Sequence, residues 1–303
     1  MYKIYCTAIL GLLIFTAPSM AQDSSLLSML DDSLNTHARA DIVTGTFKAT
    51  QIINTPTIES PAKKGLQFLI MHRFGELSDG GYALFGLDNA EIRFGLDYGL
   101  TNRLAVGIGR SSLDKTYDAN FKLKLLRQAT GAMPVSVSLY ELLTYTTFPR
   151  KSEKPFLKPR YRTAYTSQLL IARKFTSKLS LQLSPSIIHY NMVPTPKDKN
   201  TLFAAGVGGR MKITKRMSIN AEYNYLPATQ VISFEAHNSL SLGLDIETGG
   251  HVFQLIFTNS RGMIGPYYLA KTTGEWVDGN IYFGFNISRA FNFKKKTGSG
   301  HAW

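Results

Sequence analysis

Apolar and polar residues alternate with period two along most of this chain, from about residue 65 onward. The stretch 90–98 shows the pattern well, because Phe94 and Leu96 share one phase while Arg93 and Asp97 share the other. Successive side chains of a β-strand point to opposite faces, whereas a helix would scatter both sets. The alternation therefore predicts β-strands.

Twelve segments follow this pattern. They are Leu66 to Arg73, Ala90 to Tyr98, Arg103 to Arg110, Asn120 to Gln128, Val135 to Tyr145, Ala164 to Phe175, Leu179 to Tyr190, Leu202 to Ile213, Met217 to Tyr225, His237 to Glu247, His251 to Ser260 and Asn280 to Phe291. Five short connections alternate with six longer ones, at 74–89, 111–119, 146–163, 191–201, 226–236 and 261–279. This arrangement predicts an all-β fold, an up-and-down antiparallel transmembrane β-barrel of about 12 strands.

A soluble β-sandwich or periplasmic barrel would also alternate, but with its apolar face inside. Strand lengths near the ~9 to 11 residues that cross a bilayer at a tilt favour the membrane. The last strand adds weight, since Phe283, Phe285 and Ile287 share one phase. An aromatic final strand is typical of substrates of the barrel-assembly machinery, which we expect to be a partner.

The N-terminus has the pattern of an export signal, with Lys3, an apolar stretch from Ala8 to Phe15 and a small-residue cleavage site ending at Ala21. The apolar stretch is far shorter than the roughly 20 residues of a spanning helix. The only cysteine, Cys6, lies inside this signal, so we expect no disulfide in the mature chain. Export and an even strand count predict a location in the cell outer membrane with both termini periplasmic.

Four parts follow from these boundaries: a signal peptide at 1–21, a periplasmic extension at 22–64, the barrel at 65–293 and a disordered tail at 294–303. Leucines at 26, 27, 30 and 34 have helical spacing, which makes a short amphipathic helix plausible. Phe47 to Ile53 could form a small extra strand. We expect the extension to lie at the periplasmic mouth or partly within the lumen, as a possible plug.

The chain is basic, with a net charge of +13 that falls by one when Lys3 is removed with the signal. An exported protein meets anionic headgroups first, so the expected partners are outer-membrane lipid and lipopolysaccharide, with no nucleic acid. The predicted outer connection at 146–163 is the most basic one. It contains Arg150, Lys151, Lys154, Lys158, Arg160 and Arg162. This loop either lies in water or contacts lipopolysaccharide phosphates or other anions.

Charged residues in the polar phase of the strands are the candidates for lining the lumen. They are Glu91, Arg93, Asp97, Arg103, Lys122, Lys124, Arg210, Lys212, Glu222, Asp245 and Glu247. Six cations and five acids could either line a polar pore or pair with one another and block it.

Catalytic and metal-binding motifs are weak. The histidines are scattered without zinc-ligand spacing, so we expect no metal and no cofactor. The run Gly206 to Gly209 lacks the strand-turn-helix context of a phosphate loop and is better explained as relief of crowding within a strand. His237 and Ser239 have the spacing of lipid-hydrolase pairs, but both fall in the polar phase, away from lipid. We therefore expect no enzyme.

Two passages carry a family resemblance: "EIRFGLDYGL" at 91–100 and "NRLAVGIGRS" at 102–111, preceded by Thr46 to Lys48 and Ile53 to Thr57. They resemble an uncharacterised family of Gram-negative outer-membrane β-barrels known only as a domain of unknown function. The resemblance implies architecture and location, and no activity.

Three functions stay open on these grounds. A passive or weakly selective channel for small solutes is the first hypothesis, because about twelve strands enclose an interior between filled small barrels and wide porins. The alternatives are a non-conducting structural or adhesion barrel and, third, an outer-membrane lipid hydrolase.

Overall fold

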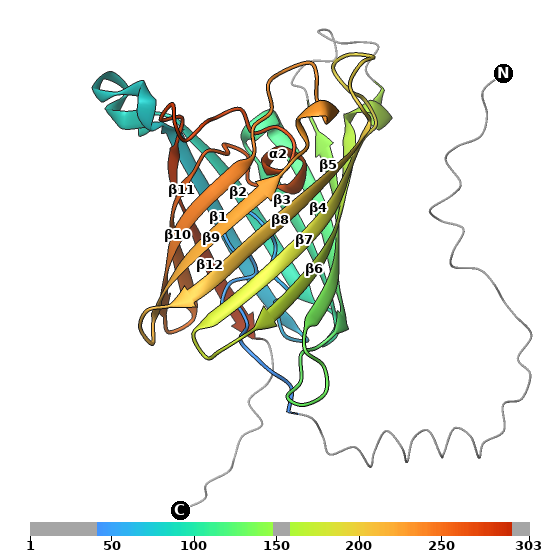
Figure 1. Cartoon of the computed structure of the whole chain (residues 1–303), viewed down its shortest axis with the longest axis vertical. Coiled ribbons are helices and arrows are strands. Elements are labelled where there is room, and N and C mark those ends of the chain that lie inside the picture. The colour runs from blue at the N-terminus through green and yellow to red at the C-terminus, as the bar shows by residue number, and fades with distance from the viewer. Residues whose placement is uncertain (1–40, 148–157, 293–303) are drawn as a thin grey trace, which may run out of the picture. The chain divides into compact units, whose positions relative to one another are not determined.

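In the computed structural model, which describes residues 41–147 and 158–292, the chain from Ile42 onward forms a closed antiparallel barrel (Figure 1). Each strand pairs with its neighbours in sequence, and β1 pairs with β12 to close the ring. The strands are β1 Gly65–Glu76, β2 Ala90–Gly99, β3 Leu104–Ser111, β4 Thr116–Leu126, β5 Ser136–Thr146, β6 Thr163–Lys174, β7 Leu179–Tyr190, β8 Thr201–Lys212, β9 Met217–Tyr225, β10 Ser239–Thr248, β11 His251–Thr258 and β12 Tyr282–Asn292. The predicted twelve-stranded up-and-down barrel is confirmed.

The barrel is apolar outside and polar inside. In β9, Ser218, Asn220 and Glu222 are buried, whereas the alternate residues Ile219 and Tyr223 are 44% and 39% exposed. A water-soluble β-protein has the opposite distribution. The period-two alternation therefore places apolar side chains where lipid would surround them.

The largest boundary error is at the start of β4. The sequence placed a long connection at 111–119, but β4 begins at Thr116 and the connection to β3 has only the four residues 112–115. The reason is that Thr116 and Asp118 are buried while Tyr117 between them is exposed, so the alternation starts earlier than the stretch beginning at Asn120 suggested.

The connections differ between the two ends of the barrel. The end with connections 100–103, 127–135, 175–178, 213–216 and 249–250 is called the turn end. The opposite end, called the loop end, has the four-residue connection 112–115 and five longer loops. The loops contain short helices: α2 Gly265–Tyr268 and the 3-10 helices Leu77–Asp79, Gly81–Gly86, Leu113–Lys115, Pro159–Arg162 and Ala228–Gln230. Within the described ranges, the chain has no helix of the length and apolarity that a membrane crossing requires.

Candidate functional site: the filled lumen

Residues 46–58, here called the plug segment, lie inside the barrel. All of them are buried except Lys48 and Gln51. The segment folds back on itself, because the amide of Ile52 donates to the carbonyl of Thr55 (2.8 Å) and the amide of Thr57 to that of Thr50 (2.9 Å). The small strand expected over Phe47 to Ile53 is not formed, since this turn uses the backbone groups that a strand would need.

The tip of the plug segment surrounds one carboxylate of the barrel wall. Glu222, on β9, accepts hydrogen bonds from the backbone amides of Ile53 (3.2 Å), Asn54 (3.0 Å) and Thr55 (3.0 Å). Asn54 also links this group to a buried cation, because Arg73 on β1 donates to its side-chain oxygen (2.9 Å). Three charge-assisted hydrogen bonds hold the tip more strongly than neutral ones would.

Amides from other strands bind the rest of the plug backbone. Gln182 on β7 donates to the carbonyl of Pro56 and accepts from the amide of Ile58. Gln254 on β11 donates to Ile52, and Asn286 on β12 donates to Ile53. The wall thus satisfies backbone groups that the turn leaves unpaired, as burial requires.

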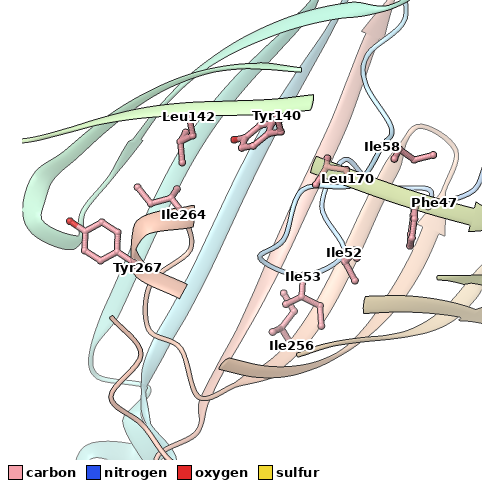
Figure 2. Packing of buried hydrophobic residues seen from close by; sticks show 11 residues of the cluster. Phe47, Ile52, Ile53, Ile58, Tyr140, Leu142, Leu170, Ile256, Ile264 and Tyr267 are labelled. Carbon is pink, nitrogen blue, oxygen red and sulfur yellow. The ribbon is translucent and has the colours of Figure 1, made fainter. Parts of the chain in front are cut away.

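Apolar side chains of the plug segment pack in the middle of the lumen. Ile52, Ile53 and Ile58 belong to one buried cluster with Leu170 and Ile256 of the wall (Figure 2). Two inward glycines make room for them. A Cβ on Gly208 would lie 2.7 Å from Cδ1 of Ile52, and one on Gly243 would lie 3.3 Å from Ile53. The hypothesis that the 206–209 glycines relieve crowding thus has a specific cause at Gly208, the docked plug.

The connection 259–281 enters the lumen from the loop end. Met263 packs on Leu69 and Met71 of β1. Within α2, the Tyr267 hydroxyl lies 2.9 Å from Oγ1 of Thr116, and the Tyr268 hydroxyl donates to Gln168 (3.2 Å). Ile264 and Tyr267 of this loop share the buried cluster with the plug segment (Figure 2), so the two fillings meet inside the barrel.

Five of the predicted lumen charges form ion pairs: Arg93, Arg210, Asp245, Glu247 and, at the loop end, Glu91. Arg93 binds Asp118 through two contacts of 2.6 and 2.9 Å. Arg210 binds Glu247 at 2.7 Å and lies 4.0 Å from Asp245. Glu247 also reaches the plug segment through Lys48, at 3.1 Å.

Lys122 donates to the carbonyl of Glu59, just beyond the plug segment, at 2.7 Å. Lys122 and Asp97 border a cavity of about 20 Å³, and Lys124 a cavity of about 70 Å³. These volumes hold a few water molecules at most.

Three candidates lie toward the ends of the barrel. Arg103 was wrongly placed in the lumen, because it lies in the 100–103 turn before β3 and its side chain is exposed. Lys212, the last residue of β8, is half-buried. At the loop end, Glu91 pairs with Arg261 and accepts from Ser112.

Of the basic loop, Arg150, Lys151 and Lys154 lie outside the described residues, as do the predicted signal, helix and tail. Lys158 and Arg160 are exposed, and Arg160 stacks on Tyr161 with its guanidinium carbon 4.9 Å from the ring centre. Lys158, Arg160 and Arg162 belong to the connection between β5 and β6, so the prediction that they lie in a loop is confirmed.

Several residues that hold the plug segment were not singled out from sequence. Arg73, Gln182 and Gln254 lie in the buried phase of their strands, which is the available signal. Asp118, the partner of Arg93, was missed because the start of β4 was placed too late.

Glu141 is a charged residue on the outer face of the barrel, in the middle of β5. Its carboxylate accepts a hydrogen bond from the hydroxyl of Ser167 at 2.5 Å.

A closed antiparallel barrel with an apolar exterior and a polar, charged interior defines a membrane-spanning β-barrel protein. The chain belongs to the membrane bound beta barrel domain family DUF5777, which matches residues 47–291. The matched region includes most of the plug segment. The family's function is unknown, and the resemblance noted in the sequence is confirmed.

Known structures share the barrel at low identity. The NanC porin is 8% identical, with 76% of this chain and 100% of that chain covered and a TM-score of 0.47. The COG4313 outer membrane channel from Pseudomonas putida F1 is 12% identical, with 77% and 97% covered and a TM-score of 0.47. Outer membrane phospholipase A from Escherichia coli is 10% identical, with 76% and 90% covered and a TM-score of 0.42. No curated protein matches the sequence.

Proposed function

We propose that this protein is an outer-membrane channel for small solutes whose lumen is closed by the plug segment and opens when that segment moves. The observation that carries the proposal is how residues 46–58 are held. Their hydrogen bonds go to side chains of the wall, such as Glu222, Gln182 and Asn286. Water can replace each of these contacts, so the plug can leave without breaking the hydrogen bonds between strands.

The open lumen would be weakly selective. The pairs Arg93–Asp118 and Arg210–Glu247 lie within the wall and would persist without the plug. If Glu59 moves with the plug segment, Lys122 loses that contact and faces the lumen beside Asp97. Neutralising Lys122, Lys124, Arg210 and Lys212 together should therefore shift ion preference toward cations.

We further propose that the turn end faces the periplasm and that both termini lie there. Short turns at the periplasmic rim and longer outer loops are typical of such barrels. A tag within 148–157 should be labelled on intact cells, whereas a tag at Gly249 should need a permeabilised membrane. Labelling of only the Gly249 tag on intact cells would show that the orientation is the opposite of the one proposed.

A non-conducting structural barrel is the second candidate, favoured by the loop 259–281. Met263 and Tyr268 of this loop are buried inside the barrel and would also have to move for a wide passage. A barrel with both fillings fixed would serve as a scaffold or an adhesin.

A lipid hydrolase has less support, and we propose that the protein is not an enzyme. Nδ1 of His237 lies 2.7 Å from a carboxylate oxygen of Glu275. Oγ of Ser239 is buried and has no hydrogen-bond partner among the described residues, so His237 does not activate it in this geometry.

A disulfide that reversibly fixes the plug segment to the wall distinguishes the channel from the structural barrel. A Cβ on Gly243 would lie 3.3 Å from Cγ1 of Ile53, which brings an Ile53→Cys, Gly243→Cys pair close to disulfide range. The only native cysteine is Cys6, in the predicted signal. In planar bilayers, the oxidised double variant should be silent and should conduct after reduction, while each single variant conducts under both conditions.

Equal conductance of the double variant before and after reduction would reject the plug segment as the gate. Silence of wild type and reduced variant alike, with folding shown by heat-modified gel migration, would reject the channel and leave the structural barrel.

A further inference from the structure

A larger pocket than those in the lumen lies at the loop end, apart from the plug segment. It measures about 330 Å³ and is bordered by the connections 191–200, 226–238 and 259–281 together with the ends of β7 and β8. Leu202 and Ala270 in its lining belong to a buried apolar cluster that also contains Ile188 and Leu269. The pocket therefore rests on a packed apolar base, and its volume falls within the range of small-molecule sites.

The walls combine apolar side chains with three charged groups. Val193, Pro194, Val231 and Phe234 are among the apolar residues of the lining. The charged residues of the lining are Asp198, Lys199 and Lys271. Two cations against one acid leave the pocket with an excess of positive charge.

The one acid is fully engaged by its own loops. Asp198 accepts from the amide and hydroxyl of Thr195, at 3.0 and 2.6 Å. Its other oxygen accepts from the amides of Ile232 (2.8 Å) and Ser233 (2.9 Å). Four donors satisfy this carboxylate, so it has little left to offer a ligand cation.

Lys271 has no such carboxylate partner. Its ammonium lies over two aromatic rings, 5.3 Å from the centre of Tyr190 and 4.8 Å from that of Tyr267. No carboxylate of the described residues lies within ion-pair distance of it. The backbone of Lys271 is held by its amide, which donates to the carbonyl of Tyr267 at 2.8 Å, and the two rings hold its ammonium. The loop thus holds an accessible cation at the edge of an apolar pocket.

We propose that this pocket binds a small organic carboxylate whose body is apolar, either an aromatic ring or a short alkyl chain. The body would replace water against Val231 and Phe234, and the carboxylate would bind Lys271, with Lys199 as a second cation. Asp114 attracts Lys271 from outside the pocket lining, but a neutral molecule of the same shape would add no charged partner within it. Acetate would not cover the apolar walls. The pocket therefore selects for both features in one molecule.

Binding is tested at equilibrium, which keeps the result independent of whether the barrel conducts. Full-length protein in phosphatidylcholine nanodiscs would be titrated calorimetrically with phenylacetate, phenylacetamide and acetate. The variants are Lys271→Met, Lys271→Arg and Ser233→Phe, the last placing bulk in the lining. Lys197→Met is the matched control, because Lys197 is exposed on the same connection as Lys199 but does not line the pocket.

Wild type and Lys197→Met should bind phenylacetate in preference to both other probes. Lys271→Met should weaken phenylacetate roughly ten- to hundredfold, as expected for a hydrogen bond to a charged group, and leave phenylacetamide unchanged. Lys271→Arg should restore most of the affinity, and Ser233→Phe should weaken both aromatic probes. Equal affinity of wild type for phenylacetate and phenylacetamide, unchanged binding in Lys271→Met, or no binding by wild type would each overturn the proposal.

Discussion

The carboxylate of Glu222 gives the sharpest test of how the plug is held. It is the only acceptor described for three consecutive amides, those of Ile53, Asn54 and Thr55. The substitution Glu222→Gln keeps the size of the side chain but turns one acceptor oxygen into an NH₂ donor. At least one plug amide then faces a donor in a buried place.

The expected magnitude follows from the number of contacts. A hydrogen bond to a charged group contributes about 1.5–3 kcal/mol, and a buried polar group left unpaired costs about 1–3 kcal/mol. Part of this is offset because glutamine is easier to desolvate than glutamate. We expect the docked state to lose about 2–4 kcal/mol, a shift of roughly thirty- to seven-hundredfold toward the undocked state.

Hydrogen exchange measures this shift directly. Amides of 47–58 should exchange faster in Glu222→Gln by the same factor if they exchange through undocking of the plug, while strand amides keep their protection. Glu76→Gln is the control, because that carboxylate contacts Ser78, Asn280 and Tyr282 and no residue of the plug segment. Equal protection of 47–58 in Glu222→Gln and wild type, with the barrel intact, would refute the view that Glu222 anchors the plug.

Three further perturbations test other parts of the structure. Leu242→Arg puts a charge on the outer face and should reduce stability by about 2–4 kcal/mol if that face meets hydrocarbon, as measured by denaturant unfolding in vesicles; unchanged stability would contradict a lipid-facing Leu242. Glu141→Leu removes a carboxylate from the same face and should raise the unfolding free energy by about 1–2 kcal/mol in that assay, because an acid on the lipid face destabilises a barrel less than Arg or Lys does. A loss of stability would mean that the hydrogen bond from Ser167 contributes more than desolvation of the carboxylate costs. The hydrogen bonds from Thr195, Ile232 and Ser233 hold the pKa of Asp198 well below its usual range. The contribution of this carboxylate is therefore complete above the ordinary aspartate pKa and disappears only as pH falls through the lowered one. Exchange at 231–234 should accordingly stay slow in wild type at mildly acidic pH and be faster in Asp198→Asn at neutral pH; identical exchange in both would remove Asp198 as the link between these loops.

The strands and their two faces were determined by the sequence alone. Alternation is a local property, because each residue's side follows from that of its neighbour once the backbone is extended. This is why Phe94 and Arg93 could be assigned to opposite faces without any tertiary information, and why all twelve strands were found. The errors fell at strand ends, at Thr116 and Arg103, where short alternating stretches merge with turns.

The filling of the lumen was decided by the tertiary structure. The plug segment has no periodicity that marks it for burial, and its main anchor, Glu222, lies 168 positions from Asn54 in the chain. The pocket at Lys271 likewise depends on three connections that meet only after the barrel has closed. Sequence indicates which residues point inward, but closure of the ring determines which of them meet, because their partners come from opposite sides of the barrel.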